Sequence, residues 1–161
     1  MNAIDLLKQQ HREVEKLFKK IEKAGPDEKE KLFDGLGDAL AVHAAIEEQH
    51  FYPATKDART EELLEEAVEE HLSVKRIIAD LLEMEPDDAQ FDAKIKVLQE
   101  QVEHHVEEEE KQLFPEVQKL HSKDELEDLG VLMEQTAEEL KEQGAPRMEV
   151  PKETGAAAPI D

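Results

Sequence analysis

One short pattern occurs twice in this chain and constrains its fold more than any other feature. His43-Ala-Ala-Ile-Glu-Glu and His105-Val-Glu-Glu-Glu-Glu both read H-x-x-x-E-E, and a proline follows each histidine after ten positions. Residues four apart lie one turn above each other on the same face of an α-helix. Each pattern therefore pairs an imidazole with the carboxylate of Glu47 or Glu109, two side chains that can bind one metal ion.

Apolar residues recur at helical spacing through most of the chain. This periodicity predicts helices over residues 2–24, 27–53, 60–83 and 87–120. One histidine interrupts each of the four apolar stripes: His11, His43, His71 and His105. Two further histidines, His104 and His121, lie off the stripes and are predicted to face solvent.

A fifth helix is predicted from Ser122 to Gln143, because Ser122 followed by Glu125 forms a capping-box pattern. This helix has no histidine on its stripe and is predicted to pack on the other helices or to form a subunit contact. From Gly144 the chain is rich in proline, glycine and alanine without an apolar period, which predicts a mobile tail. The predicted domains are a bundle (1–120), an accessory helix (121–143) and a mobile tail (144–161).

Short connections between the predicted helices make consecutive helices antiparallel neighbours. The predicted fold class is all-α: an up-down-up-down four-helix bundle with an additional C-terminal helix and a flexible tail. Within the second helix, Gly35 and Gly37 predict a kink or a break. The two halves look like a duplicated helical hairpin, since corresponding histidines lie about sixty positions apart.

Composition excludes several classes of function. With 20 basic and 42 acidic residues, the formal net charge is −22, which argues against binding to nucleic acid or to anionic membranes. The absence of cysteine excludes disulfides, thiolate zinc sites and thiol catalysis. The sequence has neither a signal-like N-terminus nor an apolar run long enough for a membrane helix, so a soluble cytoplasmic protein is expected.

Two glutamates on core-facing stripes require a compensating charge. Burying an ionised carboxylate costs several kcal/mol unless it is paired or bound to a metal, and no Lys or Arg lies on the inner stripes nearby. The sequence therefore predicts a metal site with the ligands His11, His43, Glu47, His71, His105 and Glu109. Imidazole and carboxylate ligands favour iron, manganese or zinc. With Glu47 and Glu109 bridging two ions, each ion keeps open positions for an oxo, hydroxo or exogenous ligand.

Several neighbours of this set have less certain roles. Glu48 and Glu110, the second glutamates of the two patterns, continue an acidic run and are expected on a solvated face. His50 lies on nearly the same helix face as His43 and is expected to be a polar neighbour of the site. Tyr52, the only tyrosine, could reach the pocket near the following proline. Whether His50 or Tyr52 joins the site stays open.

These motifs resemble the hemerythrin-like, HHE cation-binding domain family over about residues 1–120. The resemblance includes the Phe-Tyr-Pro and Leu-Phe-Pro sequences that follow the two patterns. It implies a non-haem, oxo- or hydroxo-bridged di-iron centre with Glu47 and Glu109 bridging, and small ligands such as O₂, peroxide or NO. Oxygen-carrying hemerythrins have His-x-x-x-His on the third helix, whereas His71 here has Ala67 and Lys75 at the flanking positions. The site is therefore expected to have four histidines, not five, and a more open coordination sphere.

Four functions remain as alternatives at this point. The centre could bind O₂ or sense iron or redox state, or it could be an enzyme that destroys peroxide in a catalase-like way or removes NO. A ferritin-like iron-handling protein is a further alternative, because the Glu-x-x-His spacing of such proteins occurs at Glu47–His50. It is the lesser one, because the second pattern has Gln112 in place of the histidine. A metal-free structural bundle is disfavoured by the buried glutamates. Homo-oligomers could form through the C-terminal helix.

Overall fold

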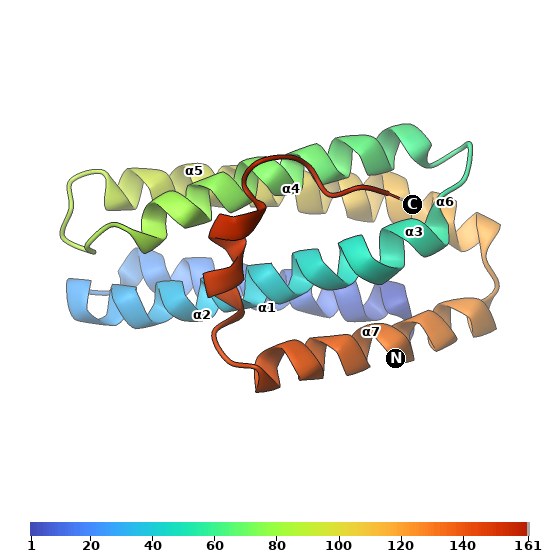
Figure 1. Cartoon of the computed structure of the whole chain (residues 1–161), viewed down its shortest axis with the longest axis horizontal. Coiled ribbons are helices and arrows are strands. Elements are labelled where there is room, and N and C mark those ends of the chain that lie inside the picture. The colour runs from blue at the N-terminus through green and yellow to red at the C-terminus, as the bar shows by residue number, and fades with distance from the viewer. Residues whose placement is uncertain (161) are drawn as a thin grey trace.

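The computed structural model describes residues 1–160, which form helices and no strand. The all-α class is thus confirmed, while the up-down-up-down order stays a prediction. The α1, α2, α4 and α5 helices lie along the long axis of the molecule, and α7 lies against α1 and α2 (Figure 1). The elements are α1 (Ala3–Lys23), α2 (Pro26–Ile46), η1 (Glu47–Phe51), α3 (Tyr52–Thr55), α4 (Glu61–Leu82), α5 (Phe91–Glu108), η2 (Glu109–Leu113), α6 (Phe114–Leu120), α7 (Lys123–Glu142) and η3 (Pro146–Glu153).

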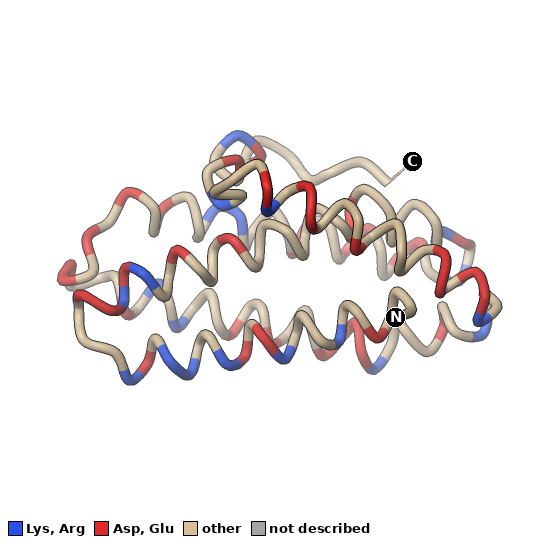
Figure 2. Tube along the Cα trace, turned by 90° about the horizontal axis from the view of Figure 1, so that it is seen from below, with Lys and Arg blue, Asp and Glu red and all other residues tan. Residues whose placement is uncertain are grey.

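Local sequence signals set the helix ends close to where they were predicted. The Asn2 side chain accepts a hydrogen bond from the Asp5 backbone N–H at 2.9 Å and caps α1. Ser122 and Glu125 form the predicted capping box at the start of α7. None of the described helices is long and apolar enough to cross a membrane. Figure 2 shows acidic residues along the length of the helices, so the negative charge is not confined to one segment of the chain.

The break predicted at Gly35 and Gly37 is wrong, because α2 continues through both glycines. The interruption comes later, where a π-helical turn begins at the glutamate of each pattern. In η1 the Tyr52 N–H donates to the Glu47 carbonyl, and in η2 the Phe114 N–H donates to the Glu109 carbonyl. Proline lacks an N–H and clashes with the carbonyl four residues earlier, so the prolines that follow favour a widened turn.

Two apolar clusters lie at opposite ends of the helices, with the buried histidines between them. On α1, Ile4 and Leu7 belong to one cluster, Phe18 and Ile21 belong to the other, and His11 separates them. On α4 the two clusters follow in the same order, and on α2 they follow in the reverse order, with Leu40 before His43 and Ile46 after it. On α5 the buried residues before His105 belong to the second cluster, and the first cluster is reached only after it, at Leu113 in η2. Each helix is therefore anchored by close-packed apolar side chains on both sides of its histidine, which holds the polar layer in place.

The C-terminal segment is packed, which differs from the expected absence of structure. Within residues 144–160, η3 crosses α2 and α4 (Figure 1), and Val150 is buried in the second apolar cluster. Arg147 forms an ion pair with Asp38 at 3.1 Å, and Arg76 donates to the Thr154 carbonyl at 3.0 Å. Apolar periodicity could not reveal this element, because a single buried side chain and several ion pairs hold it. Its mobility stays a prediction, and Asp161 lies outside the described residues.

Replacing Gly130 with alanine is expected to destabilise the fold by about 2 kcal/mol through overpacking. A Cβ on Gly130 would lie 2.8 Å from the Ala3 backbone nitrogen and closer still to the Met1 carbonyl oxygen, so α7 would have to move away from α1. Gly35→Ala is the matched control, because nothing lies within 4 Å of its Cβ position. The control should stabilise the chain by about 0.5–1 kcal/mol through helix propensity. Urea unfolding measures both, and equal effects would contradict the close α1–α7 contact.

Candidate metal centre

The structure brings the six predicted ligands together in one buried layer. They come from α1, α2, η1, α4, α5 and η2, and all are buried: His11, His43, Glu47, His71, His105 and Glu109. The inward-facing positions that helical periodicity predicted for these residues thus lie close together. Whether they hold a metal is taken up below as a proposal.

The six side chains form two groups that could each hold a cation. One contains His11, His43 and Glu109, and the other contains Glu47, His71 and His105. Within each group, the candidate ligand atoms all lie within 4.8 Å of one another. This spacing suits a small ion placed among them.

Each glutamate contacts histidines of both groups. Glu109 places one oxygen 3.2 Å from His11 Nε2 and the other 3.3 Å from His105 Nε2. Glu47 Oε1 lies 3.3 Å from His43 Nε2 and 3.1 Å from His71 Nε2. Both carboxylates therefore connect the two groups.

The Nδ1 atom of each of the four buried histidines contacts a polar side chain on another helix. The Nδ1 contacts are His11 with Glu110 at 2.6 Å, His43 with Gln10 at 2.7 Å, His71 with Glu48 at 2.7 Å and His105 with Glu70 at 2.7 Å. A neutral imidazole that donates from Nδ1 presents the lone pair of Nε2. Those partners leave all four Nε2 atoms on the inner side of the layer, where a neutral imidazole could bind a cation.

The expected solvated face for Glu48 and Glu110 is therefore wrong. Both carboxylates lie next to the site and accept hydrogen bonds from histidines, because each follows a ligand glutamate by one residue and points sideways toward the neighbouring helix. Sequence reasoning also missed Gln10 and Glu70. Gln10 and Glu70 occupy equivalent positions in the internal repeat. Each directly precedes a histidine, on α1 or α4, and contacts the histidine of the next long helix.

Tyr52 joins the site and His50 does not. The Tyr52 hydroxyl donates to Glu109 Oε2 at 2.6 Å and lies 3.1 Å from Glu47 Oε1. Burial and the two carboxylates raise the pKa of Tyr52 well above its usual value, so the phenol keeps its proton. His50 instead contacts Thr136 Oγ1 on α7 at 2.7 Å. The corresponding residue of the second pattern is Phe114, which stacks on His11, so the phenol makes the site asymmetric.

Electrostatics in the metal-free site favour protons on three of the buried histidines. Burial lowers the pKa of His11, His71 and His105, but the neighbouring carboxylates outweigh it and raise the pKa of His11 and His71, and that of His105 well above the ordinary value. Burial would raise the pKa of Glu47, but the charge of His43 and hydrogen bonds with the neighbouring side chains together outweigh this and hold the pKa well below its usual range. A cation would therefore compete with protons for the same nitrogen atoms.

Lys75 contradicts the expectation that no lysine or arginine lies near the site. It is buried on α4, one turn after His71, and its Nζ lies 2.9 Å from Glu48 Oε1 and 2.9 Å from Glu153 Oε1. Both of these carboxylates lie outside the ligand set. The charges of Glu47 and Glu109 therefore still lack a lysine or arginine partner among the described ion pairs.

The two remaining histidines differ from each other. His104 is exposed, as predicted, with 63% of its side chain accessible, and it contacts Glu70 and Glu108 on the surface. His121 is 20% accessible and contacts Glu125 at 3.4 Å, so it faces solvent only in part. Neither histidine belongs to the two buried groups.

Comparison with known proteins agrees with the geometry of the site. The sequence model of the hemerythrin HHE cation-binding domain matches residues 2–117. The chain belongs to this family. A crystal structure of an HHE cation-binding domain-containing protein from Mycobacterium kansasii has a TM-score of 0.77 and 29% sequence identity, and the match covers 93% of this chain and 99% of that one.

Relatives of this HHE domain occur both as single domains and in a longer protein. An uncharacterized protein of Mycobacterium tuberculosis is 32% identical over 144 residues, which are 88% of this chain and 88% of that protein. A protein named DNA nickase from Nostoc sp. is 27% identical over 115 residues. That match covers 71% of this chain but only 33% of the nickase, so the chain spans about a third of that relative's length.

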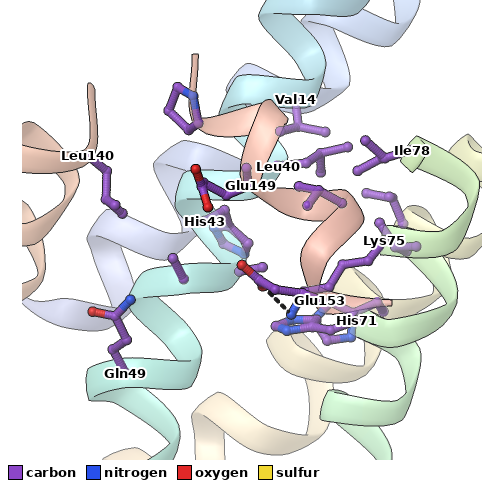
Figure 3. A pocket seen from close by; sticks show the side chains of 18 of the residues that line it. Val14, Leu40, His43, Gln49, His71, Lys75, Ile78, Leu140, Glu149 and Glu153 are labelled. Carbon is purple, nitrogen blue, oxygen red and sulfur yellow. Dashed lines mark hydrogen bonds and ion pairs between the residues drawn. The ribbon is translucent and has the colours of Figure 1, made fainter. Parts of the chain in front are cut away.

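A cavity of about 240 Å³ lies next to the candidate ligands of this HHE domain. Figure 3 shows His43 and His71 beside it, with Lys75 from α4 and with Glu149 and Glu153 from η3. All four ligand histidines contribute to its lining. Exposed lining residues such as Gln49 and Gln143 show that it reaches the surface near the end of α7.

Proposed function

We propose that this HHE domain holds two iron ions in a carboxylate-bridged centre that reacts with small oxygen or nitrogen species. The observation that carries the proposal is the pair of buried His–Glu groups joined by Glu47 and Glu109. In this arrangement His11 and His43 are terminal ligands of one ion, and His71 and His105 are terminal ligands of the other. The scaffold we propose is the up-down-up-down bundle expected from the short helix connections.

The residues present fit such a group. Among the described residues, two buried side-chain atoms lack a hydrogen-bond partner, and both belong to the ligand set: His43 Nε2 and Glu47 Oε2. Buried polar atoms without a partner are costly, and a cation would satisfy both. Nitrogen and carboxylate donors without sulfur suit iron, and manganese or zinc are the other candidates.

Bound iron supplies open coordination positions and electron transfer to O₂, peroxide or NO. The chain supplies orientation and protons. The four Nδ1 contacts hold the imidazole rings in place, and Tyr52 keeps a proton at its hydroxyl oxygen between the two bridging carboxylates. The apolar clusters on both sides of the layer limit access by water.

An enzyme that destroys peroxide or NO is favoured over a dedicated O₂ carrier. The third long helix offers Lys75 in place of a fifth histidine, and its ammonium group is already paired with Glu48 and Glu153. Fewer protein ligands leave more positions for reaction. The alternatives are O₂ binding and sensing of iron or redox state. A ferritin-like site is disfavoured, because His50 faces Thr136 and not the ligand group.

Anaerobic reconstitution with ferrous iron tests the proposal. Two irons per chain are expected, and addition of peroxide should release O₂ catalytically while NO and O₂ should each change the visible spectrum. A stable, reversible oxygenated spectrum without peroxide turnover would instead support the carrier. Failure of the chain to retain iron would contradict both functions.

Metal is expected to reverse the pH dependence of stability. Without metal, the folded state raises the pKa of His11, His71 and His105 above their ordinary value of 6.5. The stability they contribute is fully present below the unfolded pKa and is lost as the pH rises through the folded pKa. With metal, the imidazoles must be deprotonated, so the stability should rise with pH over the same range.

Urea unfolding between about pH 6.5 and pH 8.5, with a chelator or with Zn²⁺ as a redox-inert ion, measures both slopes. The glutamates do not interfere, because the pKa of Glu47 is lowered and its titration lies far below this window. Slopes of the same sign would show that the metal does not bind through these histidines.

A further inference from the structure

The cavity above the histidine layer is larger than a diatomic ligand requires. Its volume is about 240 Å³, whereas a water molecule occupies about 30 Å³ and an apolar cavity of about 150 Å³ holds benzene. It also reaches the surface through exposed lining residues, so an organic molecule can enter it.

Apolar side chains make most of its wall. They come from five helices and from η3: Val14, Leu40, Ile78, Val102, Leu140 and Val150. Figure 3 shows Val14, Leu40 and Ile78 together on one side, away from His71. The wall therefore suits the body of an apolar ligand, while the histidine layer offers a polar end.

The charged residues of the lining already have partners of opposite charge. Lys75 contacts Glu48 and Glu153, each at 2.9 Å. Glu149 contacts Lys152 at 3.2 Å on the surface. A charged ligand would have to displace one of these pairs, so the cavity favours a neutral one. At the histidine layer of the metal-free chain, His43 Nε2 is buried and has no hydrogen-bond partner, which leaves one polar contact for the ligand.

We propose that this cavity binds neutral, mainly apolar molecules of about six to ten heavy atoms with one terminal oxygen function, the class of alkyl alcohols and alkyl hydroperoxides. The apolar body lies among the Val, Leu and Ile side chains, and the oxygen function points to the histidine layer. Binding does not require metal. That an alkyl hydroperoxide is also a substrate rests on the proposed function.

Calorimetric titration of the chain with 1-hexanol, before and after metal loading, tests the binding. Saturable binding is expected, and hexanoate should bind the metal-free chain at least about tenfold more weakly than hexanol, because its charge meets the paired carboxylates. Absence of saturation with hexanol, or hexanoate binding as tightly, would overturn the proposal. Since the metal-free chain is measured separately, failure to load iron would leave the result interpretable.

Ala41→Phe places a ring in the cavity without altering a ligand residue. It should weaken hexanol binding by about tenfold or more, because most of the contacts with the apolar body are lost. Ala39→Phe is the matched control, because Ala39 is also half-buried on α2 but does not line the cavity. The affinity of this variant for hexanol should stay within about twofold of that of the unchanged chain. If Ala41→Phe unfolds, Ala41→Leu gives a smaller change of the same sign. Equal affinities in the Ala41 and Ala39 variants would place the binding elsewhere.

Discussion

Glu47→Gln and Glu109→Gln are each expected to abolish retention of both metal ions. Each carboxylate contacts histidines of both groups, so its loss removes a ligand from two ions at once. Replacing a partner that only orients a ligand weakens metal binding by about 10–100-fold, so loss of a shared ligand should exceed about 100-fold. Iron per chain after reconstitution and desalting measures the effect, and helical circular dichroism reports whether the variants fold.

The chain offers two matched controls for this experiment. Glu107 lies in α5 near Glu109 but is exposed, so Glu107→Gln should retain two irons per chain. Glu48→Gln changes no candidate ligand: it removes the carboxylate that contacts His71 Nδ1 and Lys75 Nζ, and it should give an intermediate loss, about tenfold in affinity. If Glu47→Gln keeps one iron and loses one, the carboxylate belongs to a single ion and the bridging assignment is wrong.

Helical periodicity was sufficient to find the six candidate ligands. The rise and twist of an α-helix fix which residues share a face, so a histidine on an apolar stripe must point into the same interior as its neighbours. The internal repeat then showed that His11 corresponds to His71 and His43 to His105. No information about packing between helices was needed for this step.

Contacts between helices were beyond the same reasoning. Whether Glu48 faces solvent or His71 depends on how η1 is rotated relative to α4, and that rotation is set by side-chain packing. The internal repeat, however, does predict that Glu48 and Glu110 have the same role. Glu48 contacts the histidine of α4, and its counterpart Glu110 contacts the histidine of α1, so a role found for one predicts the other.

The C-terminal segment shows a second limit of the sequence. Its position is set by long-range ion pairs, among them Arg147 with Asp38 and Glu153 with Lys75. Such pairs have no fixed spacing along the chain and therefore produce no periodic pattern in the sequence. For this reason the sequence placed Lys75 on a helix but could not show that its ammonium group is buried beneath η3.

Lys75→Met is expected to destabilise the metal-free chain by about 3 kcal/mol, because removing one member of a buried ion pair leaves the other without compensation. The side chains of Lys75 and Glu48 are only 7% and 10% accessible, so solvent cannot replace the lost partner. Glu153 is 48% accessible, and Glu153→Gln should cost less than about 1 kcal/mol. Urea unfolding of the chelated chain measures both.

The double variant Lys75→Met with Glu48→Gln distinguishes a broken pair from lost packing. If the cost of Lys75→Met arises from the uncompensated carboxylate of Glu48, the double variant should recover at least about 1 kcal/mol relative to the sum of the single changes. The recovery should be incomplete, because Glu48 also accepts a hydrogen bond from His71 at 2.7 Å. Strictly additive effects would mean that the contact between Lys75 and Glu48 adds no stability of its own, and Lys75 would then have no electrostatic link to the histidine layer through Glu48.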